Sequence, residues 1–229
     1  MRRRAVIFDM DGVLINSYRA HMQAWMRLGE KLGRPITEQE FVPTFGRRNH
    51  EIFHALWPDI PDRQIERLSD WKENAYREIV TRDFPAMDGA RELLDALKAA
   101  GFALAIGSSG PPENIEVALR GLGRAGLFDA IVSGLEVVRG KPEPEVFLKA
   151  AAKLAIEPRF SAVVEDSMAG LEAARRAGMV PIGLTGTFDR TPLAEKADLV
   201  VESLRDLAPE RIAALIDRSA AASRGGGLP

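Results

Sequence analysis

The stretch Ala5-Val6-Ile7-Phe8-Asp9-Met10-Asp11-Gly12 decides the fold, because four consecutive apolar residues stop abruptly at an acidic turn. A short, continuously apolar run of this kind is typical of a strand buried on both faces of a parallel sheet. In open α/β sheets, ligands bind beyond the carboxyl ends of the strands. The segment therefore predicts a buried strand and, directly after it, two candidate functional residues, Asp9 and Asp11.

Further short apolar runs resemble the first one and predict the remaining strands. They cover residues 102–106, 130–132, 162–164, 180–184 and, more weakly, 199–201. Amphipathic helical patterns separate these runs, and some of the patterns end at a glycine, which favours helix termination. Strands that alternate with helices predict right-handed crossovers and a doubly wound, Rossmann-like parallel sheet. The expected fold class is therefore α/β.

Residues 16–85 interrupt this alternation, because only helical patterns follow the first strand there. Gly33, Pro35, Pro58 and Pro61 punctuate these patterns. We interpret the segment as an α-helical cap domain inserted into a discontinuous core domain of residues 1–15 and 86–229. At the end of the core, small and polar residues predict a frayed tail from about residue 219.

Composition and charge narrow the possible functions. The chain has 229 residues, of which 46% are hydrophobic, enough for a packed core. A formal net charge of -2 argues against a nucleic-acid partner. No apolar run is long enough to span a membrane, so we expect a cytoplasmic protein without a membrane partner. The lack of cysteine excludes disulfides and thiolate chemistry. The oligomeric state stays open, with a monomer as one option.

Four loops at the predicted carboxyl edge of the sheet carry the reactive side chains. In chain order they hold Asp9 with Asp11, Ser108 with Ser109, Lys141, and Glu165 with Asp166. Carboxylates can bind Mg²⁺, and lysine and hydroxyl groups can hold phosphate oxygens. Asp9 could then attack phosphorus as a nucleophile. Asp11 could protonate the leaving oxygen and later deprotonate water.

This ordered set resembles the four motifs of the haloacid-dehalogenase-like hydrolase superfamily. Asp9-Met10-Asp11-Gly12-Val13-Leu14 is similar to its first motif, and Ser108, Lys141 and Glu165-Asp166 are similar to the second, third and fourth. The motifs occur in the expected order, and the resemblance spans nearly the whole chain. It implies an α/β core with a cap and phosphoryl-transfer activity.

The resemblance also implies a role for each motif residue. Asp9 is expected to be the nucleophile and Asp11 the acid/base. Mg²⁺ is the expected cofactor, with Asp9, the backbone carbonyl of Asp11, Glu165 and Asp166 as metal ligands. The dehalogenase branch lacks the second aspartate, so Asp11 favours phosphate over a haloacid as the substrate group.

A narrower resemblance links the cap to the β-phosphoglucomutase-like subgroup. His21, Ala24 and Trp25 form the pattern His-x-x-Ala-Trp in the first cap helix. Lys72, four residues before Tyr76, is similar to a substrate-contacting lysine of that subgroup. His21 and Lys72 are therefore candidate substrate-binding residues, with packing against Trp25 and an ordinary surface position as the respective alternatives.

The cap loop after Gly46 departs from that subgroup. The mutase has an arginine three residues after this glycine, where the present chain has Asn49 preceded by Arg47 and Arg48. We regard Arg47 and Arg48 as candidate substrate-binding residues, with solvated side chains as the alternative.

Three functions therefore stay open. The leading one is a phosphatase for a small phosphorylated metabolite such as a sugar phosphate. The others are a phosphomutase and, more remotely, a non-catalytic binding module.

His50 and His54 are four residues apart, a spacing that places both on one face of a helix. Such a pair can bind zinc when a third ligand is close. The sequence shows no third ligand nearby, and we therefore interpret the two histidines as ordinary surface residues.

Overall fold

The computed structural model of the chain describes residues 3–225 and is built around one parallel sheet. Its strands are β1 (Ala5–Phe8), β2 (Ala103–Gly107), β3 (Ala130–Val132), β4 (Ser161–Glu165), β5 (Val180–Leu184) and β6 (Leu199–Val201). They are ordered β3-β2-β1-β4-β5-β6, and every neighbouring pair is parallel. The predicted doubly wound α/β fold is confirmed.

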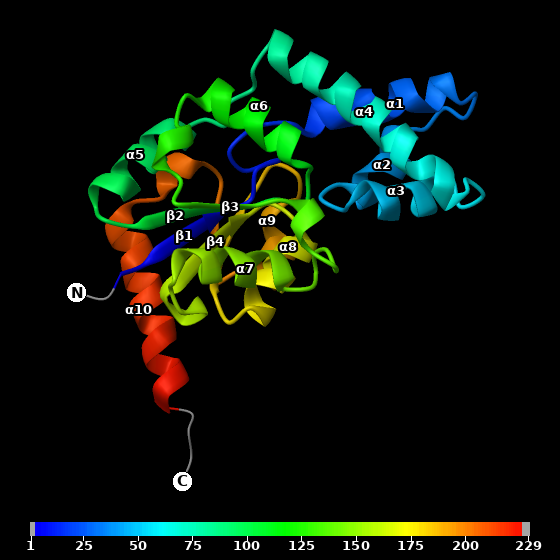
Figure 1. The fold of residues 1–229 in the computed structure, drawn as a ribbon. Coiled ribbons are helices and arrows are strands. Elements are labelled where there is room, and N and C mark those ends of the chain that lie inside the picture. Colours follow the sequence, from blue (N-terminus) through cyan, green and yellow to red (C-terminus); the bar gives the residue numbers. More distant parts are fainter. Residues whose placement is uncertain (1–2, 226–229) are drawn as a thin grey trace.

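Helices cover both faces of this sheet (Figure 1). The core helices are α5 (Ala90–Ala99), α6 (Pro112–Leu122), α7 (Glu145–Leu154), α8 (Met168–Arg176), α9 (Arg190–Ala194) and α10 (Pro209–Gly225). Short 3₁₀ helices lie at Val42–Thr44, Ala125–Leu127, Gly134–Glu136, Pro158–Phe160 and Leu204–Asp206. The chain steps from β1 outward to β3 and then returns through β4 toward β6. Right-handed crossovers in opposite directions place their helices on opposite faces, and α5 and α7 accordingly cover opposite sides of β2.

The register of the central strands aligns the ends that carry candidate site residues. Phe8, the last residue of β1, is paired with Ile106 in β2 and with Val164 in β4. All four residues of β1 are fully buried, as expected for a strand covered on both faces. The residues that follow β1, β2 and β4 therefore emerge at the same edge of the sheet.

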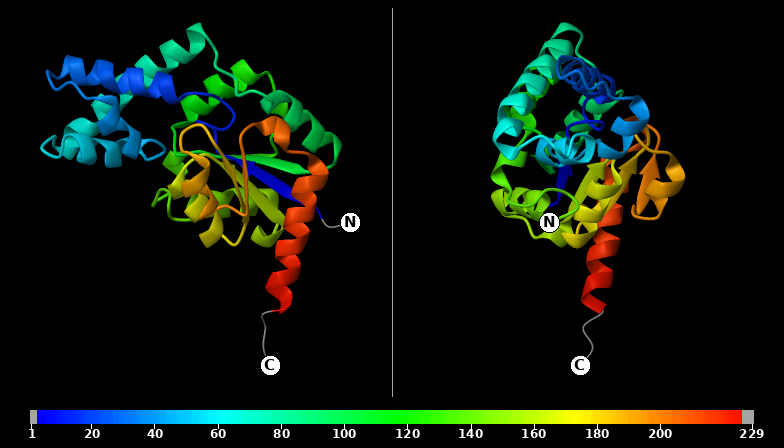
Figure 2. Two further views of the ribbon diagram at one scale, coloured as in Figure 1. Left: turned by 180° about the vertical axis from the view of Figure 1, so that it is seen from behind. Right: turned by 90° about the vertical axis from the view of Figure 1, so that its right-hand side faces the viewer.

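The helices of residues 16–85 lie to one side of that edge (Figures 1 and 2). They are α1 (Tyr18–Lys31), α2 (Glu38–Phe41), α3 (Asn49–Leu56) and α4 (Asp62–Arg82). They enclose a hydrophobic cluster of their own, in which Trp25 packs edge-on against Phe53 at a centroid distance of 5.0 Å. Aromatic pairs of this geometry add to the stability gained from burial. The cap is thus held together by its own small core.

The two chain segments that join the cap to the core run side by side. The backbone N–H of Asn16 donates to the carbonyl of Pro85 at 2.7 Å, and that of Met87 donates to Leu14 at 3.0 Å. An antiparallel bridge joins Ile15 to Ala86 between them. The crossing between core and cap is therefore a hydrogen-bonded double connection. The division into a core domain of residues 1–15 and 86–229 and a cap domain of residues 16–85 stays a prediction.

The last helix differs from the sequence-based expectation. We expected a frayed tail from about residue 219, yet α10 continues to Gly225. Ile212, Ile216 and Ala220 are buried at helical spacing, so the apolar stripe extends past residue 219. Residues 226–229, which include part of the expected tail, lie outside the described residues.

Replacing Phe53 with Ala should lower the free energy of unfolding by about 3–5 kcal/mol, because it opens a cavity beside Trp25. Urea unfolding followed by tryptophan fluorescence measures this loss. The matched control is Met26→Ala, at a half-exposed position of α1, which should change stability by no more than about 0.5 kcal/mol. Equal losses in the two variants would contradict a separately packed cap cluster.

Candidate active site

The carboxyl edge of the sheet gathers three acidic side chains around one lysine. Lys141 Nζ donates to Asp9 Oδ1 at 2.7 Å and to Glu165 Oε1 at 2.6 Å. Asp9, Glu165 and Asp166 each offer an oxygen atom within 4.8 Å of the other two. All four residues are buried. The structure therefore brings together groups that are far apart in the sequence, as the ordered motifs predict.

This cluster has more negative than positive charge. Burial and the nearby Glu165 raise the pKa of Asp9 to about 7, although Lys141 opposes the shift. Burial and the charges of Glu165 and Asp9 likewise raise the pKa of Asp166 well above its ordinary value. Three carboxylates facing one ammonium form an all-oxygen donor set with excess negative charge. The residues present therefore fit a hard divalent cation such as Mg²⁺.

Two glycines make this crowding of carboxylates possible. Gly12 has a φ of 81°, and a Cβ there would overlap the carboxylate of Asp166. A Cβ at Gly170, in the first turn of α8, would overlap the carboxylate of Glu165. Only residues without a side chain permit such close approach. The glycine near each acidic pair therefore leaves room for the carboxylates of the cluster.

Glu165 and Asp166 are also held by neighbours on their other sides. Glu165 Oε2 accepts a hydrogen bond from the backbone N–H of Ser167 at 2.7 Å. Thr187, in the loop after β5, donates its hydroxyl to Asp166 Oδ2. Thr187 was not predicted as a site residue, and its sequence signal is its place shortly after the end of a predicted strand.

The loop after β2 places its two serines differently. Ser108 is buried, and its Oγ accepts a hydrogen bond from the backbone N–H of Gly110 at 3.0 Å. Ser109 lines the same cavity as Asp9 and Asp11. Because the Ser108 oxygen is the acceptor in its bond, its own proton stays available to a ligand. Ser108 thus shapes the turn and also keeps a donor near the acidic cluster.

Asp11 is bound by two residues of the cap. His21 Nε2 lies 3.0 Å from Asp11 Oδ1, and the Tyr76 hydroxyl donates to the same oxygen at 2.9 Å. The His21 and Tyr76 rings are stacked at a centroid distance of 3.9 Å. Lys72 Nζ lies 2.8 Å from His21 Nδ1. Because an ammonium group can only donate, Nδ1 accepts and the imidazole proton resides on Nε2, facing Asp11.

These contacts affect the pKa of Asp11. Burial would raise the pKa of this carboxyl group, but His21 and Tyr76, which both face Oδ1, lower the pKa well below its ordinary value. Tyr76 was not predicted as a site residue, although it helped to identify Lys72. Its spacing of four residues from Lys72 puts both side chains on one face of α4, which is the signal that could have identified it.

Lys72 is a buried residue and not a surface lysine, so the surface alternative is wrong. Its Nζ donates to Glu73 Oε1 at 2.9 Å. Asn49 donates to the same oxygen at 2.8 Å, and Asn114 donates to Glu73 Oε2 at 2.6 Å. Glu73 and Asn114 were not predicted as site residues. Asn49, where the mutase has arginine, is thus tied to the carboxylate that holds Lys72.

A cavity of about 810 Å³ lies between the cap and the core. Asp9, Asp11, His21, Arg47 and Lys72 all contribute to its wall. The wall therefore joins the acidic cluster to the polar face of the cap, in a space large enough for a small metabolite.

Arg48 reaches from the cap to the core at the side of this cavity. Its guanidinium contacts Glu51 at 3.0 Å and donates to the backbone carbonyl of Val138 at 3.1 Å. Arg47, by comparison, contributes to the cavity wall without such a bridge to Val138. Both candidate arginines therefore line the cavity, and Arg48 also bridges the cap to the core.

The fold and this site define a hydrolase of the doubly wound α/β class with a helical cap. A family model described as haloacid dehalogenase-like hydrolase matches residues 3–178. This chain belongs to the haloacid dehalogenase-like hydrolase family. It is an enzyme of the group that includes β-phosphoglucomutase and related phosphatases, as the motif resemblance implies.

Individual relatives agree with this assignment. The chain is 35% identical over 207 residues to validoxylamine A 7'-phosphate phosphatase of Streptomyces hygroscopicus subsp. limoneus, covering 89% of this chain and 95% of the relative. It is 33% identical over 180 residues to a phosphorylated carbohydrates phosphatase of Thermotoga maritima, covering 76% and 82%. A solved structure of β-phosphoglucomutase from Clostridium difficile superposes with a TM-score of 0.85 at 26% identity, covering 96% and 100%.

Replacing Glu73 with Gln should lower the free energy of unfolding by about 3 kcal/mol at pH 7, because Lys72 would stay buried without a counter-charge. Burial favours a higher pKa for Glu73, but Lys72 and the other donors hold the pKa below its ordinary value of 4.5. The stabilisation is therefore present above that value and is lost as the pH falls through the folded-state pKa.

The measurement is urea unfolding of wild type and variant across this pH range. The difference in unfolding free energy should shrink at the acidic end. Glu78→Gln, at an exposed position of the same helix, is the control and should match wild type throughout. A difference that is independent of pH would show that Glu73 does not act through its charge.

Proposed function

We propose that this enzyme is a Mg²⁺-dependent phosphatase that hydrolyses a small phosphomonoester of the sugar-phosphate class through Asp9. The observation that carries the proposal is the buried cluster in which Asp9, Glu165 and Asp166 share the single ammonium group of Lys141. Three carboxylates with one ammonium group need further positive charge, which a divalent cation would supply. The Asp9 carboxylate also lies at the wall of the cavity, where it could act as a nucleophile.

In the first step, a carboxylate oxygen of Asp9 attacks phosphorus and the bond from phosphorus to the ester oxygen breaks. Lys141, already within hydrogen-bond distance of Asp9, and the Ser108 hydroxyl would donate to the phosphoryl oxygens. Asp11 would give its proton to the leaving oxygen, which departs as an alcohol. The products of this step are an aspartyl phosphate on Asp9 and the free alcohol.

In the second step, Asp11 takes a proton from water, and the resulting nucleophile attacks the phosphorus atom. The bond to Asp9 breaks, which restores its carboxylate and releases inorganic phosphate. A bound Mg²⁺ would neutralise charge on the phosphoryl oxygens and the attacking carboxylate. Asp9, Asp166, the backbone carbonyl of Asp11 and Glu165 are the residues proposed to hold it.

His21 and Tyr76 would control the proton on Asp11. Both contact Asp11 Oδ1 and stabilise the carboxylate, which is the form required to deprotonate water. For the first step Asp11 must carry a proton, which its low pKa disfavours. We therefore propose that the negative charge of bound phosphate raises the pKa of Asp11 when substrate is present.

The cavity wall supports a polar, phosphorylated substrate. Arg47, Lys72 and Ser109 face the space together with the acidic cluster, and the cavity holds about 810 Å³. Hydrogen-bonding side chains around such a space suit the hydroxyl groups of a sugar. The related phosphatases that act on phosphorylated carbohydrates and on validoxylamine A 7'-phosphate support this substrate class.

Asp9→Asn should reduce phosphate release from a panel of sugar phosphates by about 10³-fold or more, because it removes the nucleophile. Asp11→Asn should reduce the rate of phosphate release by about 10²–10⁴-fold. EDTA should abolish the wild-type activity, and added Mg²⁺ should restore it. Asp198→Asn, at an exposed position just before β6 and thus at the opposite edge of the sheet, is the matched control. Full phosphate release by Asp9→Asn would refute the mechanism.

A phosphomutase is the second candidate, because His21 and Lys72 match the mutase pattern: His21 contacts Asp11, and Lys72 contacts His21. Incubating the enzyme with glucose 1-phosphate and a catalytic amount of hexose bisphosphate distinguishes a phosphatase from a phosphomutase. We expect inorganic phosphate as the main product, since Asn49 is bonded to Glu73 and supplies no cation for a second phosphate. Isomerised sugar phosphate as the main product would instead establish the mutase.

The remaining expectations concern location and partners. Within residues 3–225, no helix combines the length and apolar character needed to cross a membrane. We propose a cytoplasmic enzyme whose partner is a small phosphorylated metabolite, with neither nucleic acid nor membrane as a ligand. A monomer stays one option for its oligomeric state.

A further inference from the structure

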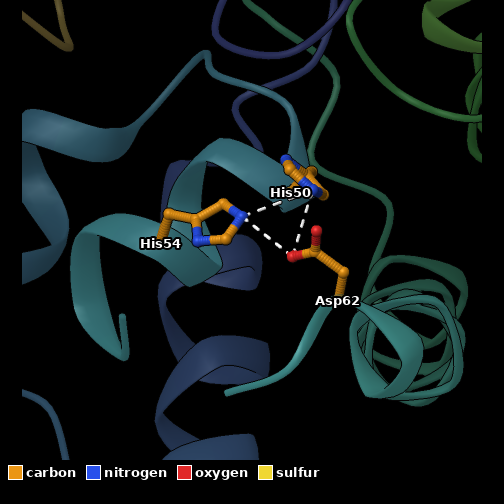
Figure 3. Close-up of side chains that lie close together, drawn as sticks. All are labelled: His50, His54 and Asp62. Carbon is orange, nitrogen blue, oxygen red and sulfur yellow. Dashed lines mark hydrogen bonds and ion pairs between the residues drawn. The ribbon is translucent and has the colours of Figure 1, made fainter. Parts of the chain in front are cut away.

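Three side chains on the cap converge outside the acidic cluster (Figure 3). His50 and His54 belong to α3, and Asp62 is the first residue of α4. His54 Nε2 lies 3.3 Å from His50 Nε2 and 3.2 Å from Asp62 Oδ1, and His50 Nε2 lies 3.6 Å from the same oxygen. Asp62 thus lies where the third ligand that the sequence did not reveal would be expected.

The spacing of these three atoms matches one face of a tetrahedral metal site. Ligand atoms about 2.0–2.1 Å from a tetrahedral zinc ion are about 3.3 Å from one another. The three observed separations of 3.2, 3.3 and 3.6 Å bracket that value. The geometry points to a second metal site, formed by His50, His54 and Asp62, for a transition metal of the zinc class.

Hydrogen bonding alone does not account for this arrangement. Each imidazole Nε2 can carry at most one proton, so the two histidines can supply a hydrogen for at most two of the three contacts among these atoms. The distance of 3.6 Å from His50 to Asp62 is too long for a hydrogen bond. One cation at the centre would satisfy His50, His54 and Asp62 together.

The donor set separates this site from the acidic cluster. Two imidazole nitrogens and one carboxylate oxygen suit Zn²⁺ and its neighbours in the transition series, whereas Mg²⁺ prefers oxygen ligands. The three residues are exposed, so water can complete the coordination. His54 and Asp62 are also separated by the turn that connects α3 to α4, and a bound ion would cross-link these helices.

An ion here would also lie beside the substrate cavity. His50 and Asp62 both contribute to the cavity wall, on the cap side. Cross-linking α3 to α4 would restrict movement of these two helices at the cavity wall, and the ion would add positive charge there. If the cavity binds the proposed substrate, the ion would influence its binding from the cap side of the wall.

Calorimetric titration of the full chain with ZnCl₂, in the presence of excess MgCl₂, tests the proposal. We expect one Zn²⁺ per chain that Mg²⁺ does not displace. Zn²⁺ binding should weaken by about 100-fold or more in His54→Gln and in Asp62→Asn, because each variant removes a ligand. Asp70→Asn, at another exposed position of α4 that lines the same cavity, should bind Zn²⁺ as wild type does.

Titration with CoCl₂ gives an independent readout that does not depend on activity. Tetrahedral Co²⁺ with nitrogen ligands absorbs strongly in the visible range, and an all-oxygen octahedral site does not. The absorption should appear in wild type and in Asp70→Asn and be lost in His54→Gln. No Zn²⁺ binding below millimolar concentration, or equal binding in all four proteins, would overturn the proposal.

Discussion

The electrostatic balance around Lys141 is the constraint on which the rest of the structure depends. Its ammonium group bridges Asp9, which directly follows β1, and Glu165, the last residue of β4, and these strands meet only in the folded sheet. Burying these carboxylates beside Asp166 is costly unless their charge is offset. The parallel register of β1 and β4, the missing side chain at Gly12 and the hydroxyl of Thr187 all serve to hold the carboxylates in place.

The cap also affects the charges at the site, through residues that contact Asp11. Asp11 belongs to the core, but both donors that contact its Oδ1 come from cap helices α1 and α4. Lys72 fixes the tautomer of His21, and Glu73 in turn fixes Lys72. Contacts between cap and core therefore lower the pKa of Asp11, so the position of the cap affects the charge of this residue as well as the shape of the cavity.

Much of the core and its motifs could be predicted from the sequence. The apolar run before Asp9 has the length and composition of a strand buried on both faces. The similar runs further along the chain indicated which loops lie at the same edge of the sheet. The cap network was less predictable, because Glu73, Asn114 and Thr187 act through neighbours that are distant in sequence. Nothing local distinguishes these polar residues from solvated ones until burial shows that their hydrogen bonds must be made within the protein.

The sequence by itself therefore determined the α/β architecture and the candidate groups at the strand ends, since hydrophobic periodicity and turn residues are local properties. Only the tertiary structure decided that Lys72 is buried and that Asp62 joins His50 and His54. It also decided that α10 continues past residue 219. The physical reason is that burial and convergence depend on how separate helices pack, and packing is a property of the whole chain rather than of any one segment.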